Sequence, residues 1–421
     1  MEILSTGEKI KRARVFKGYT LKQLCGDKVS VSKMSCIENN KIQPEDWIIR
    51  FVCEKLDLDY DYLNESIEEQ LNNNLKYLKD NKDIPEYKEE ISKNLDYCEK
   101  YELFDMAIEF MHILFDYCLD KDKVEIQSLC IKYYDLYQKA YSEKNRLVFY
   151  IDMAAYFYEN NEYQQAINYY KDIEKSLYDK PNKSDKEYQI LIVALYNSAA
   201  SYVMTKNHKK AYNTAMKIEE FIEFVNKDWK KADIYHMLAM LSLRLDNTKF
   251  DFYEKKSYEY YKDNDKLKAQ AIYNYAVVML DIGLLDRGVS YIKKCLEYFP
   301  KDDIICFVDY MLMSVEELLE RDFIDEAREI CDNALNYSIK MDNIKHIEKA
   351  YYFKAIVSYK KGEFSIAEMY INLALDALLK FGTKEEIYKR YIYMGNMYYK
   401  LNNIADSLKY FDLAVRLQKK M

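Results

Sequence analysis

The sequence predicts an all-α protein, and three features of its composition carry this prediction. Only 8 glycines and 4 prolines occur among 421 residues, so tight turns and bulges are scarce. Leu, Ile, Lys, Glu, Asn and Tyr are abundant, which indicates helices joined by short polar loops. Many of the 44 tyrosines must pack between helices with their hydroxyl groups at the edge. The length favours two or more domains, or one domain with a repeat array.

The cysteines and the apolar segments indicate the compartment. Nine cysteines are scattered along the chain without a CxxC pair, and the first residues, MEILSTGEKIKRAR, lack the apolar core of a secretory signal. We therefore expect reduced, mostly packed thiols. No apolar run approaches the roughly 20 residues that span a bilayer. The expected location is the cytoplasm, without a membrane partner.

Charge is distributed unevenly between the two ends of the chain. Residues 1–44 hold nine lysines and arginines against four acids, a net charge of +5. The whole chain has a net charge of −8, so the remainder carries −13. A basic head on an acidic body suggests that the head meets a polyanion and the body does not.

Residues 1–64 divide into five short predicted helices. Ile10 and Val15 mark the first, Gly18 allows a sharp exit, and Thr20 is the expected N-cap of LKQLC. After a turn through Gly26, Ser30 is the expected N-cap of a third helix with Met34 and Ile37 on its inner face. The fourth opens with Pro44 in its first turn, and the fifth begins near Asp59. The fourth helix should turn its apolar residues inward: Trp47, Ile48, Phe51 and Leu56.

Two short helices joined by a tight turn, the second with a polar outer face, fit a helix-turn-helix. The run S-x-x-x-x-I-E-N (residues 32–39) after G-x-T makes this segment resemble the helix-turn-helix domains of phage repressors and their bacterial relatives. The resemblance implies that Arg14 and Glu38 pair, which would lock the first helix onto the third. It covers about the first 60 residues.

The stretch SVSKMSCIENN would place its outer face in a DNA major groove. Bases would be met by serines of this helix, and phosphates by nearby lysines and by the helix end capped by Thr20. Relatives often carry Gln where this chain has Leu21 and Val31, and those glutamines bind phosphate and adenine by hydrogen bonds. Without them, sequence specificity would depend on contacts with thymine methyl groups and on DNA shape. The predicted DNA-binding residues are Thr20, Lys22, Ser30, Ser32, Lys33, Ser35 and Lys41.

Residues 65–85 form a polar, helix-prone segment, which we interpret as a linker helix that lets the head swing. Beyond it, in residues 86–421, one motif recurs: a helix, a short polar or glycine loop, and a small residue at the start of the next helix. A degenerate copy is expected near residues 245–253. Spacings near 40 residues indicate stacked helical hairpins. The small residues are Ala107, Ala166, Ala211, Gly288, Ala327, Ala367 and Ser407.

The repeats resemble lengthened tetratricopeptide repeats, which implies a right-handed solenoid. Gly283, Gly288 and Pro300 match the turn, small and terminal-proline positions of that motif, and Gly395 and Phe411 match in a later copy. HEAT repeats have a similar period but lack this helix-turn signature. Pairing of the helices before Ala166 is left open.

A groove lined by the first helix of each hairpin is the expected ligand site. Asn197 and Asn274 fall at one position of that helix, and an asparagine amide can capture a peptide backbone because it offers one acceptor and two donors. Asparagine and tyrosine are also simply common in this chain. The predicted peptide-binding residues are Tyr196, Asn197, Tyr273, Asn274, Tyr352 and Asn396.

No pattern in the sequence indicates catalysis. The four histidines, at positions 112, 208, 236 and 346, show no metal-binding spacing, and no glycine-rich phosphate loop occurs. We expect no enzyme activity, cofactor or metal.

The order of a helix-turn-helix and a long repeat array resembles the RRNPP family, the peptide-responsive quorum-sensing regulators of low-GC Gram-positive bacteria. Overall the chain looks most like the clostridial RstA type. This implies a homodimer on a palindromic double-stranded DNA operator, control by a short signalling peptide, and regulation of sporulation and toxin genes. Two alternatives stay open: an adaptor that binds a protein partner such as a sporulation phosphorelay component, and a repressor whose repeats only dimerise.

Overall fold

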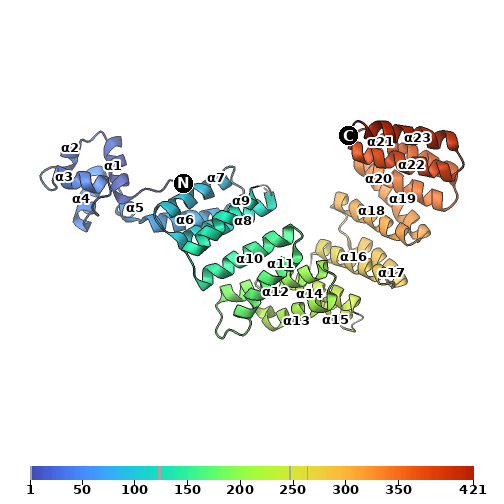
Figure 1. The fold of residues 1–421 in the computed structure, drawn as a ribbon, viewed down its shortest axis with the longest axis horizontal. Helices are drawn as coiled ribbons and strands as arrows, with labels where there is room; N and C mark the ends of the chain where they lie inside the picture. Colours follow the sequence, from blue (N-terminus) through green and yellow to red (C-terminus); the bar gives the residue numbers. More distant parts are fainter. Residues whose placement is uncertain (1, 122–124, 246–247, 263) are drawn as a thin grey trace. The chain divides into compact units, whose positions relative to one another are not determined.

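The computed structural model describes residues 2–121, 125–245, 248–262 and 264–421, and these are all-helical apart from turns and loops (Figure 1). They form two compact units, Met1–Phe224 and Val225–Met421. No helix among the described residues is both long and apolar enough to cross a membrane. The fold class expected from composition is therefore confirmed at the level of all-α structure.

Five short helices make up the head. They are α1 (Thr6–Phe16), α2 (Leu21–Cys25), α3 (Val31–Glu38), α4 (Asp46–Leu56) and α5 (Tyr60–Asn64). Thr20, Ser30 and Asp59 cap α2, α3 and α5 through their side chains, which confirms these three predicted starts. Gly18 has φ +72°, the left-handed conformation that its sharp exit requires. Pro44 lies before the N-cap Glu45, so its predicted place in the first turn of α4 was wrong.

The start of the chain ties the head to the helix that follows it. Ile3 is 3% exposed and belongs to the apolar cluster built around Leu71 and Leu75 of α6 (Ile67–Asp80). The Gln70 side chain accepts from the Leu4 amide (3.1 Å) and donates to the Leu4 carbonyl (2.9 Å). The segment interpreted as a swinging linker is thus bonded on one face to residues that precede α1.

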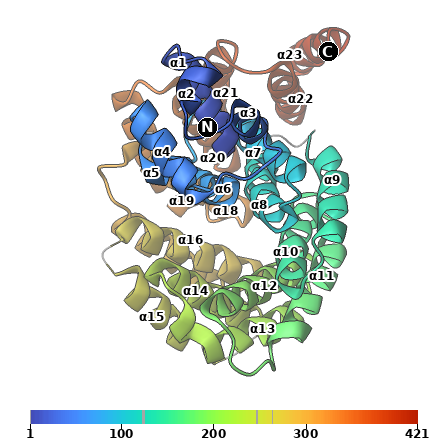
Figure 2. The same cartoon turned by 90° about the vertical axis from the view of Figure 1, so that its left-hand side faces the viewer.

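The repeats of the first unit continue from α6. Their helices are α7 (Tyr87–Lys100), α8 (Phe104–Lys121), α9 (Ile126–Lys139), α10 (Glu143–Glu159), α11 (Tyr163–Leu177), α12 (Asp185–Met204), α13 (His208–Met216) and the 3₁₀ helix η1 (Lys217–Phe224). Consecutive helices pack on each other, and α10 also packs on both α8 and α12 (Figure 2). This makes α8, α10 and α12 one layer of the first unit.

The second unit holds five helix pairs. They are α14 (Asp228–Arg244) with α15 (Phe250–Tyr261), α16 (Asp265–Asp281) with α17 (Leu285–Tyr298), α18 (Ile304–Glu320) with α19 (Ile324–Lys340), α20 (Ile344–Lys360) with α21 (Phe364–Leu378), and α22 (Lys384–Lys400) with α23 (Ile404–Gln418). The predicted degenerate copy is the pair α14–α15. Residues 246 and 247 of its turn lie outside the described part.

Seven turns between successive helices in the described part of the chain share one geometry. Each turn has a left-handed residue, and the next residue's amide donates to the carbonyl five positions earlier, as in a Schellman motif. Because five of the seven left-handed residues are not glycine, the chain needs few glycines. Those residues are Glu102, Asn161, Lys206, Gly283, Asp322, Gly362 and Asn402.

The small residues predicted from the repeated motif are all buried, and each lies in the first turn of the helix that follows the loop of its motif. Gly395 shows why the facing position must also be small: a Cβ there would lie 2.8 Å from the Phe411 ring. Ala107 differs from the others, because it opens α8, which belongs to the same layer as α10 and α12. In that copy the small residue lies in the first helix of a repeat, whereas in the other copies it lies in the second. The spacing of the motif alone did not determine this shift by one helix.

Candidate functional sites

A buried ion pair locks α1 onto α3. Arg14 donates from Nε and Nη2 to the two carboxylate oxygens of Glu38, at 2.6 and 2.9 Å, and from Nη1 to the Tyr19 carbonyl at 2.8 Å. The side chains are 13% and 3% exposed. The hydrogen bond that Arg14 donates to Glu38 raises the pKa of Arg14. The pairing that the repressor resemblance implied is confirmed.

The outer face of α3 carries the side chains predicted to reach DNA bases. Val31 is 45% exposed and Ser32 is exposed, whereas Met34 and Ile37 are buried as predicted. Ser30 is exposed and caps the helix by accepting from the Lys33 amide at 3.2 Å. Ser35 is half-buried, and its carbonyl accepts from the Asn39 amide group. Within α3 itself, the exposed residues are thus Val31 and Ser32.

Lys33 is paired with the carboxylate of Glu45, a contact that the sequence did not predict. Its ammonium is 2.8 Å from Glu45 Oε1, and the Trp47 indole N–H donates to Glu45 Oε2 at 2.6 Å. These hydrogen bonds, from Lys33 first and Trp47 second, lower the pKa of Glu45. Trp47 is 45% exposed, so its predicted inward orientation was wrong. Its hydrogen bond to Glu45 and its contact with the Lys33 cation, 5.8 Å from the ring centroid, hold the indole outside.

The remaining predicted phosphate contacts lie on the surface of the head. Lys22 and Lys41 are exposed, and neither ammonium has an ion-pair partner among the described residues. Thr20 accepts from the Gln23 amide at 3.2 Å, and Gln23 Oε1 in turn accepts from the Thr20 amide at 2.8 Å. Thr20 and Gln23 thus satisfy two of the backbone amides at this helix end through a capping box, and its use as a phosphate contact stays a prediction.

A buried lysine, missed at the level of sequence, joins the two ends of the head. Lys9 is 2% exposed, and its Nζ donates to the carbonyls of Tyr62 (2.6 Å) and Glu65 (3.0 Å). Burial lowers the pKa of Lys9 and the nearby Glu65 carboxylate opposes this. A cation at the C-terminal end of α5 also meets the negative end of the helix dipole.

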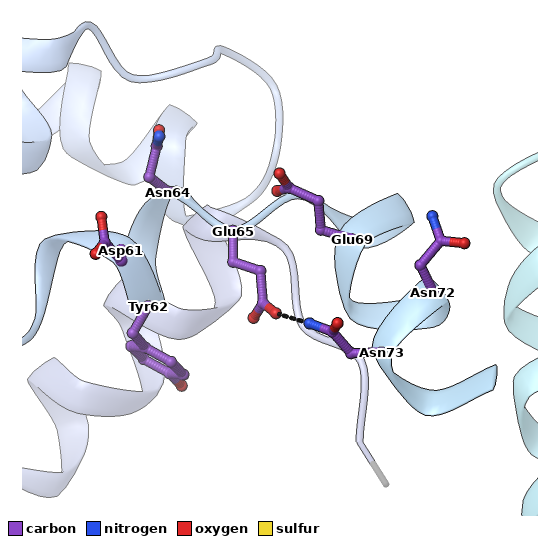
Figure 3. Close-up of a pocket in the computed structure, with 7 residues that line it drawn as sticks. All are labelled: Asp61, Tyr62, Asn64, Glu65, Glu69, Asn72 and Asn73. Carbon is purple, nitrogen blue, oxygen red and sulfur yellow. Dashed lines mark hydrogen bonds between the residues drawn. The ribbon is translucent and has the colours of Figure 1, made fainter. Parts of the chain in front are cut away.

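A hollow beside α5 and α6 gathers acidic and amide side chains (Figure 3). Its volume is about 630 Å³, and Glu65 Oε1 accepts there from Asn73 Nδ2 at 2.9 Å. In the described part of the chain, no group of three or more His, Cys, Asp or Glu is arranged to hold a metal ion. The hollow is lined by Asp61, Tyr62, Asn64, Glu65, Glu69, Asn72 and Asn73.

In the first unit, the predicted peptide residues lie on α12. Tyr196 and Asn197 are both half-buried. Burial raises the pKa of the Tyr170 hydroxyl, and a hydrogen bond with the Asn197 side chain opposes the rise. Asn197 is thus positioned by α11 and remains partly open to solvent.

In the second unit, the predicted residues lie on three helices. Asn274 of α16 is exposed, with Nδ2 3.2 Å from His236 Nε2. Tyr273 is only 5% exposed and packs on Tyr310, so its side chain contributes to the core. Tyr352 of α20 is half-buried beneath the Arg390 guanidinium, 3.9 Å from the ring centroid, and Asn396 of α22 is exposed.

The partner of Asn274 is a neutral histidine. Burial lowers the pKa of His236 to about 4, and its Nδ1 has no hydrogen-bond partner among the described residues. The ring packs on Tyr275, with centroids 4.8 Å apart. An uncharged imidazole and an exposed amide side by side can bind a peptide group by hydrogen bonds, without requiring charge.

A buried polar network lies at the equivalent place in α10. Asp152, Asn197 and Asn274 each precede the left-handed residue of their turn by nine positions. Asp152 is 6% exposed, and its carboxylate oxygens accept from His112 Nδ1 at 2.9 and 2.8 Å. The Tyr133 hydroxyl also donates to Asp152, at 2.7 Å. Because the residue at this position of α10 is an aspartate, the recurrence of asparagine in the sequence did not indicate it.

Solved structures of other proteins share the repeat architecture, although no family model and no curated protein matches the chain. The apo form of RapI matches with a TM-score of 0.51 and 14% identity, over 83% of this chain and 98% of RapI. The apo quorum sensor NprR from B. thuringiensis matches with a TM-score of 0.46 and 16% identity, over 84% of this chain and 100% of NprR. Bacillus thuringiensis PlcR, in complex with the peptide PapR7 and DNA, matches with a TM-score of 0.34 and 17% identity, over 61% of this chain and 94% of PlcR. The likeness to RapI shows that this chain has a helical-repeat fold of the same kind.

Proposed function

We propose that this chain is a DNA-binding transcription regulator of the RRNPP family whose activity is controlled by a short signalling peptide bound in its repeats. A cytosolic role in quorum sensing, with control of sporulation and toxin genes as in the RstA type, follows from the resemblance. The observation that carries the proposal is the pair Arg14–Glu38, which fixes α3 with Val31 and Ser32 exposed. That is the arrangement a recognition helix needs.

Lys33 and Glu45 test the DNA-binding face. Lys33→Ala should weaken duplex binding and reduce the slope of log affinity against log salt by about 0.9, since one phosphate contact is lost. Glu45→Gln should strengthen binding, because it removes the carboxylate that holds the Lys33 ammonium at 2.8 Å. The measurement is fluorescence anisotropy with operator fragments recovered by chromatin immunoprecipitation and sequencing.

Lys209→Met is a suitable control for both variants, because Lys209 is exposed on α13, far along the chain from the head. If Ser32→Ala combined with Lys33→Ala leaves affinity unchanged at fixed salt, α3 does not contact DNA.

We propose in addition that the protein acts as a homodimer. One head offers little contact area, and two-fold pairing would set recognition helices about 34 Å or a multiple apart.

Asparagine variants test control by peptide. A peptide of roughly five to ten residues should raise the melting temperature by mass action. Asn274→Ala should remove that shift while leaving helicity and basal DNA binding intact, because the exposed Asn274 amide bonds to the His236 side chain alone among the described residues. Asn197→Ala tests the first unit in the same way. A variant pair that responds fully to the peptide by differential scanning fluorimetry would exclude these asparagines from the site.

The adaptor alternative is separated from the regulator by removing DNA binding alone. Deleting residues 1–64 is unsuitable, because it would also remove Ile3 from the cluster that covers Leu71 and Leu75. Ser32→Glu with Lys33→Glu keeps the fold and repels phosphate. A regulator would lose its effect on transcription in this variant, whereas an adaptor would retain it.

A further inference from the structure

A cavity of about 580 Å³ lies in the first unit and is lined by α8, α10, α11, α12 and the loop before α12. Its apolar lining includes Ile108 of α8, Val148 of α10 and Ile190 of α12. None of the predicted peptide-binding residues lines it. The volume falls in the range of ligand sites, and such sites combine an apolar wall with a few polar groups.

The carboxylates around this cavity are already paired. Glu109 Oε2 lies 2.9 Å from Lys79 Nζ and its Oε1 lies 3.0 Å from Lys144 Nζ. Burial would raise the pKa of Glu109, but these two lysines lower it to about 2. The other two lining carboxylates are bound as well, Glu187 by Lys180 at 2.5 Å and Glu143 by Arg146 at 2.7 Å.

One lining cation has no counter-ion. Lys186, in the first turn of α12, is exposed and makes no ion pair or side-chain hydrogen bond within the described residues. The lining holds three lysines and three carboxylates, and Lys186 is the lysine that no carboxylate pairs with among the described residues. An apolar cavity with a free ammonium at its rim complements a ligand that carries an apolar group beside a carboxylate, because the carboxylate would neutralise that ammonium.

A second polar group faces the same space. The His112 ring lines the cavity, and Asp152 binds its Nδ1, which orients the opposite edge away from that carboxylate. When the imidazole is protonated, Nε2–H is a second donor at the cavity wall. Because Tyr133 fixes Asp152 in turn, the ring is positioned before any ligand arrives.

We propose that this cavity binds the C-terminal residue of the signalling peptide, with its apolar side chain among Ile108, Val148 and Ile190 and its α-carboxylate at Lys186. His112 donates to the same terminal residue from Nε2. This inference rests on the proposed control by a peptide and adds where one end of the peptide is held. It also sets the chemistry of that end, which is an apolar residue with a free carboxylate.

The test uses the full-length chain and two matched hexapeptide libraries, one with free C-terminal carboxylates and one with C-terminal amides. Free-acid peptides that end in Leu, Ile, Val or Phe should be enriched on the protein. Amidation should weaken the enriched peptides by about tenfold, the loss expected for one charge-assisted hydrogen bond. Lys186→Met should weaken the free acids by a similar factor and leave the amides unchanged.

Two further variants sharpen the result. Ile190→Trp, which fills the cavity from α12, should abolish selection of the last residue, whereas Lys209→Met, at an exposed lysine outside the cavity, should change nothing. Peptides that bind but are indifferent to amidation and to Lys186→Met would overturn this inference and leave the proposed function standing. The inference would also be overturned if amidated peptides lost affinity in Lys186→Met, because Lys186 would then bind an internal Asp or Glu side chain and not the C-terminal carboxylate. A protein that binds no peptide in either library would overturn both.

Discussion

Replacing Glu38 with alanine should unfold the head at a temperature at which the repeats remain folded, and operator binding should be lost with it. The change leaves the Arg14 guanidinium, 13% exposed, without its anion. Removing one partner of a buried ion pair costs about 3–5 kcal/mol. A head of about 60 residues has little stability to spare, because small domains bury a smaller fraction of their surface.

The two tryptophans make the experiment direct. Trp47 lies in the head and Trp229 in α14, so a Trp229→Phe background reports only on the head. Arg50→Ala is the matched control, because Arg50 pairs with Asp46 on the surface, with side chains 65% and 59% exposed. Pairs of that kind contribute about 0–1 kcal/mol.

The expected result is an early fluorescence transition for Glu38→Ala and an unchanged one for Arg50→Ala. Replacing both partners by apolar residues, Arg14→Met with Glu38→Leu, should restore most of the lost stability, since neither charge is then buried alone. A Glu38→Ala head that melts together with the original protein would show that the pair does not fasten α1 to α3.

The helix starts of the head that the sequence predicted correctly depend on local interactions. The N-caps Thr20, Ser30 and Asp59 each bond to a backbone amide three residues later, so the signal lies within one turn. Lys9 could not be predicted in this way, because its acceptors are carbonyls of residues 62 and 65. From the sequence alone, a lysine next to Ile10 is expected to be solvated. Its burial follows only when the fold brings residues 62 and 65 next to it.

The repeats show the same division. The Schellman turns were visible because a small residue and a short polar loop recur together, and the structure places each small residue in a buried first turn. The phase of the copy at Ala107 was not predictable from spacing, since a shift by one helix preserves the local motif. The candidate cavity was not predictable for a related reason: its walls come from four helices, and its charge balance depends on pairs such as Lys79 with Glu109.

Replacing Asp152 with alanine should destabilise the first unit by about 2 kcal/mol, the usual contribution of hydrogen bonds to a charged group. It removes the acceptor of both His112 Nδ1 and the Tyr133 hydroxyl, which come from α8 and α9. Asp172→Ala is the control, because Asp172 is an exposed carboxylate on α11. Urea denaturation followed by circular dichroism measures the difference, and two variants of equal stability would contradict the role of this network.

The same network should make the stability of the first unit depend on pH. Burial lowers the pKa of His112, but attraction and hydrogen bonding to Asp152 outweigh it, so the pKa is raised above its ordinary value of 6.5. Protonated His112 is therefore favoured by folding. Its stabilisation should be complete below pH 6.5 and should be lost as the pH rises through the higher pKa of the folded state. Asp152→Ala should reduce this alkaline loss and lower the His112 pKa, because desolvation then acts against only the weaker attraction of Asp116, and Lys79 adds to the lowering. With four histidines in the chain, the His112 resonance can be assigned by substitution and titrated by NMR. A His112 pKa that does not fall in Asp152→Ala would show that Asp152 does not hold the imidazolium, and Nε2 would then lack a proton to donate to the cavity at neutral pH.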